Sequence, residues 1–169
     1  FGKPYLCRMK ILMVCLGNIC RSPLAEAVLR KKVRDAGLNW FIDSAGTNGF
    51  HTGEAPHHFT QKVAKANHMD ISNLRARQFT ALDCELFDKI YVMAADVLEE
   101  VKEIAGIQFN PGMTDYFLNE LHPGKNEDVF DPWYGGYDGF EKVYQLIDET
   151  CNAILKSYFT ALKTTQAQL

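Results

Sequence analysis

Short apolar runs alternate with segments of helical periodicity along this chain of 169 residues. Apolar runs such as residues 11–14 are typical of buried strands, and helices follow them at regular intervals. We predict strands at 10–14, 40–43, 90–93 and 114–118. We predict helices at 22–36, 56–67, 96–105 and 139–162, whereas the rest of 106–130 has no clear pattern.

Two of these helices carry further signals. Ser22 is a favourable N-cap and Pro23 suits the first helical position, so we expect the first helix to begin there. Gly37 suits the position just beyond its C-terminus. In the last helix the apolar residues repeat with a period of 3.6, which predicts a long amphipathic helix packed on the core. These residues are Phe140, Val143, Tyr144, Ile147, Cys151, Ile154, Leu155, Tyr158 and Leu162.

The repeated strand-helix order predicts an α/β protein with a single three-layer domain. Strands that alternate with helices form a parallel sheet, and right-handed crossovers produce an open, doubly wound sheet. We therefore expect a four-stranded parallel sheet with helices on both faces, of the flavodoxin or Rossmann type. The domain is expected to span 9–169, since this length suits one core. Residues 1–8, which precede Met9, are interpreted as an extension or an expression remnant.

The composition narrows the classes of partner. The formal net charge is −3 and 47% of the residues are hydrophobic, so nothing indicates binding to nucleic acid or to an anionic membrane. No apolar run approaches the roughly 20 residues of a membrane span, and residues 1–8 lack the apolar core of a signal peptide. We expect a monomer, with a weak dimer as the alternative.

The five cysteines indicate a reducing compartment. An odd number in a chain of ordinary size argues against a secreted disulfide framework and favours the cytoplasm. Neither the cysteines nor the five histidines have the spacing of a metal site, so we expect no metal and no cofactor. His57 and His58 are interpreted as solvated residues of a loop or a helix start.

Residues 14–23 combine a strand end, a tight loop and a helix start. A helix N-terminus presents unpaired N–H groups and the positive end of its dipole to the preceding loop, which favours a bound phosphate and an ionised cysteine. Arg21 can hold two phosphate oxygens at once, and the phosphorus then faces the sulfur of Cys15. A C-x5-R spacing alone is weak evidence, but the strand before it and the helix after it make it specific.

Hydrolysis of a phosphomonoester also requires a proton on the leaving oxygen, and Asp131 is the best candidate acid. Pro132 restricts the backbone at Asp131, and the pair Gly135 and Gly136 indicates a movable loop. Asp128 is the alternative if the register of this loop differs.

The segment 15–26, CLGNICRSPLAE, is similar to the signature of the low-molecular-weight protein tyrosine phosphatases. Further blocks at 43–47, 76–78 and 131–135 follow in the order of that family. The resemblance extends over nearly the whole chain from Met9. It implies a four-stranded parallel sheet and hydrolysis of phosphotyrosine monoesters through a phosphocysteine intermediate.

The resemblance assigns roles to individual residues. Cys15 matches the nucleophile, and Asp131 matches the general acid that later acts as base on water. Ser44 is expected to hydrogen-bond Asn18 and stiffen the loop, and Ser22 to hydrogen-bond the Cys15 thiolate. The residues expected to bind phosphate are Leu16, Gly17, Asn18, Ile19, Cys20, Arg21 and Ser22.

Aromatic residues near these loops predict a slot for a flat ring. Trp133 and Tyr134 follow the candidate acid, and Phe50 lies in the loop after the second strand, so the three can wall a pocket for a phenyl group. Ile19 resembles the tyrosine type of the family, whereas a smaller polar residue there resembles the phosphoarginine phosphatases. The expected partners are phosphotyrosine proteins or aryl phosphates.

Cys20 lies in the same loop as Cys15 and suggests redox control. An exposed thiolate reacts with peroxide, and the resulting sulfenate can be trapped as a Cys15–Cys20 disulfide. The family carries this cysteine in that role. A small buried residue is the alternative interpretation of Cys20.

Two other functions remain open from the sequence. Arsenate fits a phosphate-binding loop, but arsenate reduction on this fold needs resolving cysteines outside the loop, and Cys84 stands alone in its region. The second alternative is a non-catalytic phosphotyrosine-binding module. The presence of Cys15, Arg21 and Asp131 together argues against it.

Overall fold

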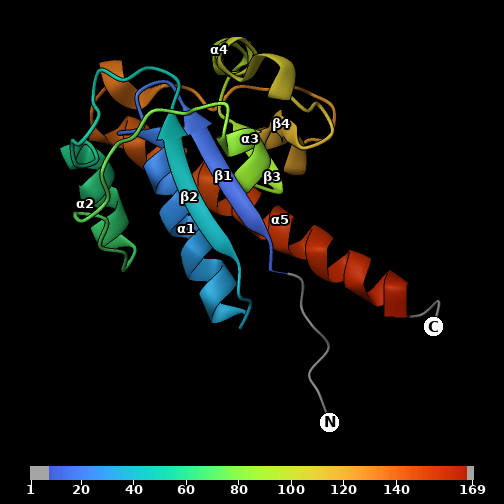
Figure 1. Ribbon diagram of the computed structural model, residues 1–169. Helices are drawn as coiled ribbons and strands as arrows, with labels where there is room; N and C mark the ends of the chain where they lie inside the picture. The colour runs from blue at the N-terminus through green and yellow to red at the C-terminus, as the bar shows by residue number, and fades with distance from the viewer. Residues whose placement is uncertain (1–7, 167–169) are drawn as a thin grey trace.

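The computed structural model describes residues 8–166 and contains four strands in the order β2-β1-β3-β4 (Figure 1). Every neighbouring pair is parallel, as predicted. The segment interpreted as an extension, 1–8, lies outside the described residues except for Arg8. The strands are β1 (Lys10–Cys15), β2 (Phe41–Gly46), β3 (Lys89–Val92) and β4 (Thr114–Tyr116).

Helices of very different length connect these strands. The α-helices are α1 (Arg21–Asp35), α2 (His58–Ala66), α3 (Asp83–Leu86), α4 (Ala95–Ala105) and α5 (Tyr137–Gln166). Three short 3-10 helices are η1 (Gly106–Gln108), η2 (Phe117–Glu120) and η3 (Pro132–Tyr134).

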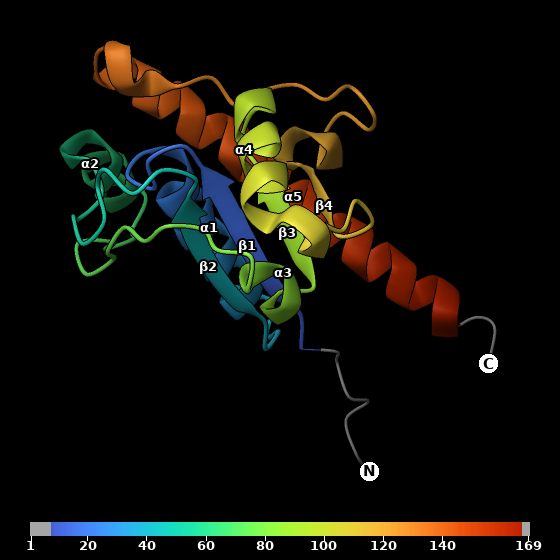
Figure 2. The same cartoon turned by 45° about the horizontal axis from the view of Figure 1, so that its top comes forward.

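Alternate residues of β1 face two separate hydrophobic clusters. Ile11 and Met13 are buried in one cluster with residues of α1 and α5, whereas Leu12 and Val14 are buried in the other with residues of α4. This follows from the period of two in a strand that is covered on both faces. Figure 2 shows α3 and α4 in front of the sheet and α1 behind it. The predicted three-layer α/β class is thus confirmed.

The start of α1 differs from the prediction. The N-cap is Cys20 rather than Ser22, and no side chain caps the helix there. Ser22 lies inside the first turn, and Pro23 is the third helical residue rather than the first. The reason is that the hydroxyl of Ser22 hydrogen-bonds side chains of the preceding loop instead of a backbone N–H group. Proline is still tolerated, because N–H groups of the first turn have no partner within the helix.

Other boundaries differ for local reasons. Strand β2 continues past 43 to Gly46, since it pairs with β1 as far as Cys15. Strand β4 ends at Tyr116, where the chain turns into η2. No sequence pattern predicts α3, because four residues are too few to show helical periodicity. Gly37 follows α1 with φ 70°, as predicted for a glycine beyond a helix end.

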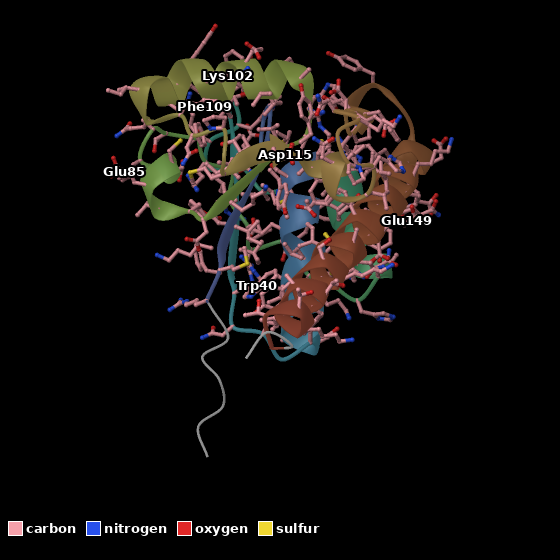
Figure 3. The ribbon with its side chains drawn as sticks, turned by 90° about the vertical axis from the view of Figure 1, so that its right-hand side faces the viewer. Trp40, Glu85, Lys102, Phe109, Asp115 and Glu149 are labelled. Carbon is pink, nitrogen blue, oxygen red and sulfur yellow. The ribbon has the colours of Figure 1, made fainter. Side chains whose placement is uncertain are left out.

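Helix α5 covers one face of the sheet with the apolar positions that the sequence predicts. Phe140, Val143 and Ile147 are fully buried in the same cluster as β1. Near the far end of the helix, Trp40 meets Tyr158 edge to face, with ring centroids 4.7 Å apart, and Figure 3 shows Trp40 beside this part of α5. No helix among residues 8–166 is both long and apolar enough to cross a membrane.

The arrangement of the strands determines where a ligand site can form. Strand β1 lies between β2 and β3, so the crossover from β1 to β2 and the crossover from β2 to β3 run in opposite directions along the sheet. Ligands of open parallel sheets bind beyond the carboxyl ends of the strands at such a point. In Figure 1 the loops after β1 and β2 lie at this end, together with the orange segment that precedes α5.

Candidate active site

Cys15 is the last residue of β1 and is buried, with 2% of its surface exposed. Its Sγ lies 3.0 Å from Oγ of Ser22 and accepts a hydrogen bond of 3.3 Å from the backbone N–H of Asn18. Both groups belong to the segment that immediately follows, because the loop folds back over the strand end. The sulfur is therefore placed at the start of α1, close to the N–H groups of its first turn.

Asn18 holds this loop in shape through every polar atom of its side chain. Its backbone is left-handed, with φ 56°, a conformation that asparagine adopts more readily than most residues. Nδ2 donates to Oγ of Ser22 and to Oγ of Ser44, both at 2.9 Å. Oδ1 accepts from the backbone N–H of Arg77 at 3.0 Å. The expected contact between Asn18 and Ser44 is present.

A buried carboxylate lies behind Ser44. The hydroxyl of Ser44 donates to Glu26 of α1, and Arg30, one turn further along the helix, forms an ion pair with the same carboxylate. Burial raises the pKa of Glu26, although the hydrogen bond from Ser44 and the charge of Arg30 act in the opposite direction. Sequence patterns do not reveal this contact, since Glu26 reads as an ordinary residue of a helix.

Arg21 connects the segment after β1 to a distant loop. It is the first residue of α1 and is buried, with 5% of its surface exposed. Nη1 donates to the carbonyl oxygen of Val129 at 2.9 Å, and Nη2 lies 3.4 Å from Oδ2 of Asp131. The guanidinium group is therefore oriented by groups that lie 108 and 110 residues away in the sequence.

The two candidate acids, Asp131 and Asp128, lie in different surroundings. Asp131 caps η3, with Oδ1 accepting from the N–H of Trp133 at 3.0 Å, and it lines the same pocket as Cys15. Asp128 accepts from the N–H of Ala95 at 2.9 Å, at the start of α4, and does not line that pocket. The position of Asp131 therefore suits the role of an acid at this site, whereas Asp128 serves the end of another helix.

A pocket of about 300 Å³ opens in front of Cys15. The candidate aromatic residues form its rim: Phe50 and Tyr134 are 87% and 93% exposed, and Trp133 is 44% exposed. Asn18, Ser22 and Ser44 do not line the pocket but hold its floor from behind. The lining residues are Cys15, Leu16, Gly17, Ile19, Cys20, Arg21, Asn48, Phe50, His51, Asp131, Trp133 and Tyr134.

Sequence reasoning missed two of these lining residues, Asn48 and His51. Both lie in the loop after β2, which has no regular pattern. The ring of His51 covers the loop closely, since a Cβ placed on Gly17 would lie 3.0 Å from its Cδ2 atom. Its Nδ1 lies 2.8 Å from the carboxylate of Glu54. The sequence HTGE at 51–54 has no pattern that predicts a contact with Gly17, because only the fold brings the two segments together.

Cys20 also lines the pocket but differs from Cys15 in its surroundings. Burial raises its pKa to about 12, and the proximity of Cys15 and Asp131 acts in the same direction. Cys20 is therefore a neutral thiol near pH 7. Within residues 8–166, no group of three or more histidine, cysteine or acidic side chains is arranged to hold a metal ion.

This arrangement can bind a tetrahedral anion in front of a sulfur atom. The first turn of α1 offers N–H groups, Arg21 offers a planar cation, and Asp131 supplies a carboxyl group at the edge of the same pocket. A sulfur atom and a guanidinium group beside the N-terminus of the first helix are suited to phosphoryl transfer.

The comparisons with known proteins identify the family. The family model described as "Low molecular weight phosphotyrosine protein phosphatase" matches residues 10–167. The chain belongs to this family and is a low-molecular-weight protein tyrosine phosphatase, a hydrolase of phosphoric monoesters.

Individual relatives agree with this assignment. The low-molecular-weight protein-tyrosine-phosphatase YfkJ of Bacillus subtilis is 38% identical over 151 residues, which are 88% of this chain and 95% of YfkJ. The crystal structure of YfkJ superposes with a TM-score of 0.82, covering 92% of this chain and 97% of that one at 34% identity.

Two further solved structures are similar to this chain, and the name of one includes a bound ligand and the name of the other an activity. Wzb of Vibrio vulnificus, solved in complex with benzylphosphonate, has a TM-score of 0.79 at 33% identity and covers 89% of this chain and 99% of its own. DARP, an arginine phosphatase of Drosophila, has a TM-score of 0.80 at 32% identity and covers 89% of this chain and 98% of its own.

Proposed function

We propose that this phosphatase hydrolyses phosphotyrosine monoesters and related aryl phosphates through a phosphocysteine intermediate. The observation that carries the proposal is that Cys15, Arg21 and Asp131 line a single pocket of about 300 Å³. The nucleophile, the phosphate-binding cation and the candidate acid come from two loops that are more than 100 residues apart.

In the first step the sulfur of Cys15 attacks phosphorus and an S–P bond forms. The bond from phosphorus to the leaving oxygen breaks, and Asp131 gives its proton to that oxygen. Arg21 and the N–H groups at the start of α1 stabilise the charge on the other phosphate oxygens. The hydroxyl of Ser22, with its Oγ 3.0 Å from Sγ, can donate a hydrogen bond to the sulfur.

In the second step water attacks the phosphocysteine. Asp131, now a carboxylate, accepts a proton from that water while the P–O bond forms. The S–P bond breaks, and inorganic phosphate and the Cys15 thiolate are produced. One aspartate thus serves both steps, because it is left deprotonated by the first.

The aromatic rim supports an aryl ester as substrate. Phe50, Trp133 and Tyr134 are exposed around the mouth of the pocket, where they can stack on a phenyl ring. A relative, Wzb, was solved with benzylphosphonate, in which the phosphonate is attached through one carbon to a phenyl ring. The similarity to DARP makes phosphoarginine the substrate to test against phosphotyrosine. Ile19, an apolar residue of the pocket lining, favours the aryl ester.

The test compares Cys15→Ser and Asp131→Asn with the unmodified enzyme on phosphotyrosyl peptide, phosphoarginine and p-nitrophenyl phosphate. We expect Cys15→Ser to lose all turnover and Asp131→Asn to retain phosphate binding with a slow first step. Cys84→Ser is the matched control, since this cysteine lies outside the pocket. Turnover in Cys15→Ser at the unmodified rate rejects the mechanism, and preference for phosphoarginine rejects the substrate.

We also propose that Cys15 and Cys20 form a reversible disulfide under oxidation. Hydrogen peroxide oxidises the Cys15 thiolate to a sulfenate and is itself reduced to water or hydroxide. The Cys20 sulfur then attacks the sulfenic sulfur, an S–S bond forms, and the oxygen leaves as water. Both cysteines line the same pocket, which supports this pairing. Peroxide inactivation that a thiol reverses in the unmodified enzyme, but not in Cys20→Ser, is the expected result.

A thiolate nucleophile works only while it is reduced, so we propose that the enzyme acts in a reducing compartment such as the cytoplasm. We propose a monomer as the working form, since the pocket is built from one chain. Equal specific activity over a wide range of enzyme concentration, together with a monomeric mass in solution, is the expected observation.

A further inference from the structure

His57 contacts four parts of the molecule that meet beside the pocket. It is the N-cap of α2, and its Nδ1 accepts a hydrogen bond of 3.1 Å from the N–H of Phe59. Its own backbone N–H donates to the carbonyl oxygen of Ile19, in the phosphate-binding loop, at 2.8 Å. The sequence-based interpretation as a solvated helix-start residue therefore covers only the first of these contacts.

The imidazole ring lies against residues of two further elements. It stacks on Phe140 of α5, with centroids 4.9 Å apart and planes 13° apart. It also meets Trp133 of η3, with centroids 5.4 Å apart at an angle of 64°. Phe140 is fully buried, so one side of the imidazole rests on the core while its contact with Trp133 reaches the pocket rim.

The backbone of Trp133 in turn forms a hydrogen bond with the candidate acid, Asp131. Its backbone N–H donates to Oδ1 of Asp131 at 3.0 Å, and Oδ2 of the same carboxylate faces Arg21. Trp133 thus contacts His57 through its ring and Asp131 through its backbone. Among residues 8–166, the other hydrogen bond to this carboxylate is the 3.4 Å contact of its Oδ2 with Arg21.

The lowered pKa of His57 favours an uncharged imidazole, which suits a ring packed against other rings. Burial lowers the pKa of His57, and the neighbouring His58, whose ring stacks at 4.3 Å, acts in the same direction. The ring is thus neutral near pH 7, and Nδ1 keeps the lone pair that accepts from Phe59.

We infer that His57 is a positioning residue for the reaction: its ring holds Trp133, and through Trp133 it sets the placement of Asp131 over the phosphate-binding loop. The inference rests on the proposed role of Asp131 as general acid. Displacement of a catalytic group by about 1 Å can cost on the order of 100-fold in rate, so a single ring contact can control the acid step.

The test uses the dependence of kcat/KM on the leaving group. Phenyl phosphate releases a strongly basic phenolate and needs the acid, whereas p-nitrophenyl phosphate releases a weaker base and needs it less. Loss of fold stability lowers both rates equally, but displacement of Asp131 lowers the phenyl phosphate rate more. The readout is therefore the ratio of the two kcat/KM values.

Two substitutions separate the ring from the helix cap. His57→Asn keeps an acceptor at the N-cap position, where asparagine is favoured, but removes the ring. We expect it to lower the phenyl phosphate rate about 10-fold more than the p-nitrophenyl phosphate rate. His57→Phe keeps a ring without the acceptor and should retain the unmodified ratio. His58→Asn is the matched control, one position along the same helix, and should also leave the ratio unchanged.

Asp131→Asn provides the reference and separates the two hypotheses. If Asp131→Asn does not lower the ratio, the proposed acid is wrong regardless of His57. If Asp131→Asn lowers it but His57→Asn does not, the inference about His57 is overturned and the acid stands. In the double variant, His57→Asn should add no further change in the ratio. An equal loss for both substrates in His57→Asn, or a lowered ratio in His57→Phe, also overturns the inference.

Discussion

The guanidinium of Arg21 lies 3.4 Å from the carboxylate of Asp131, although 110 residues separate the two in the sequence. Nη1 of the same group is held at 2.9 Å by the carbonyl oxygen of Val129, two residues before Asp131. One buried side chain thus links the anion-binding loop to the loop that carries the candidate acid. We therefore expect a change at Arg21 to affect the placement of both loops.

Arg21→Lys should therefore reduce activity strongly although the charge is conserved. Lysine is a point charge that cannot bind two phosphate oxygens in a planar fork, and it cannot also reach Val129 and Asp131. We expect kcat/KM on p-nitrophenyl phosphate to fall by about 100-fold or more, with weaker inhibition by inorganic phosphate. Arg34→Lys, at an exposed position of the same helix, is the control. Activity within a factor of three of the unmodified enzyme contradicts the role of the fork.

Substitutions of Asn18 should separate backbone conformation from side-chain hydrogen bonding. Asn18→Gly accepts φ 56° without strain, whereas Asn18→Ala does not, and both lose the bonds to Ser22, Ser44 and Arg77. We expect kcat to fall about 10- to 100-fold in Asn18→Gly and further in Asn18→Ala. Steady-state kinetics on p-nitrophenyl phosphate measure the effect. Full activity in Asn18→Gly is the result that argues against the side chain as the support of the loop.

Glu26 should make the free energy of unfolding depend on pH. Its pKa is raised in the folded state above its ordinary value of 4.5, because burial disfavours the carboxylate. The folded protein therefore binds this proton more tightly than the unfolded chain does. Its contribution to stability is present in full below the unfolded pKa and decreases as pH rises through the folded pKa.

The measurement compares the unmodified protein with Glu26→Gln by urea unfolding from about pH 4 to about pH 7. The stability of the unmodified protein relative to Glu26→Gln should decrease with rising pH, by at most about 1.4 kcal/mol per pH unit. Glu99→Gln, at an exposed position on α4, should show no such trend. An increase in the relative stability of the unmodified protein with pH is the opposite sign and excludes a raised pKa at Glu26.

Tyr158→Phe should not destabilise the fold. The hydroxyl of Tyr158 is buried and has no hydrogen-bond partner among the described residues, so its removal relieves a desolvation cost. We expect the free energy of unfolding to stay unchanged or to rise by up to about 1 kcal/mol. Tyr158→Ala removes the ring that packs on Trp40 and should lower it by about 1–3 kcal/mol. A loss in Tyr158→Phe as large as in Tyr158→Ala indicates a hydrogen bond to that hydroxyl.

Alkylation should distinguish the cysteines of the described chain. Burial raises the pKa of Cys20 to about 12, and it also raises those of Cys84 and Cys151, so these three remain thiols at neutral pH. We expect iodoacetamide at pH 7 to modify Cys15 first, with loss of activity, and phosphate to protect it. Peptide mass spectrometry assigns the site. Modification of Cys20 ahead of Cys15 is incompatible with the proposed nucleophile.

The sequence was sufficient to predict the parallel sheet, and also the strand, loop and helix start that surround Cys15. The strand before Cys15 and the helix after it are local patterns, and local patterns are what a single sequence displays. The misassigned helix cap at Ser22 shows the limit: a serine at a helix start reads as a cap, but the folded loop supplies a better partner in Cys15 and Asn18.

The contacts that the sequence could not predict are those made across the fold. Glu26 lies one turn inside a helix, and nothing local reveals that β2 brings Ser44 against it. His51 and His57 both reach Trp133 from a loop and a helix start that are some 80 residues away in the chain. Such pairings depend on the packed arrangement of α2, α5 and the loop before α5, not on residue spacing.

The floor and the rim of the pocket belong to different stretches of chain. The floor residues all lie within one continuous segment, 15–21, whereas Phe50 and Trp133 come from two separate loops. The rim loops can therefore change length or side chains without altering the floor. Variation in these two loops is a direct route to new ester preferences on an unchanged hydrolytic centre, and it is where an engineer should begin.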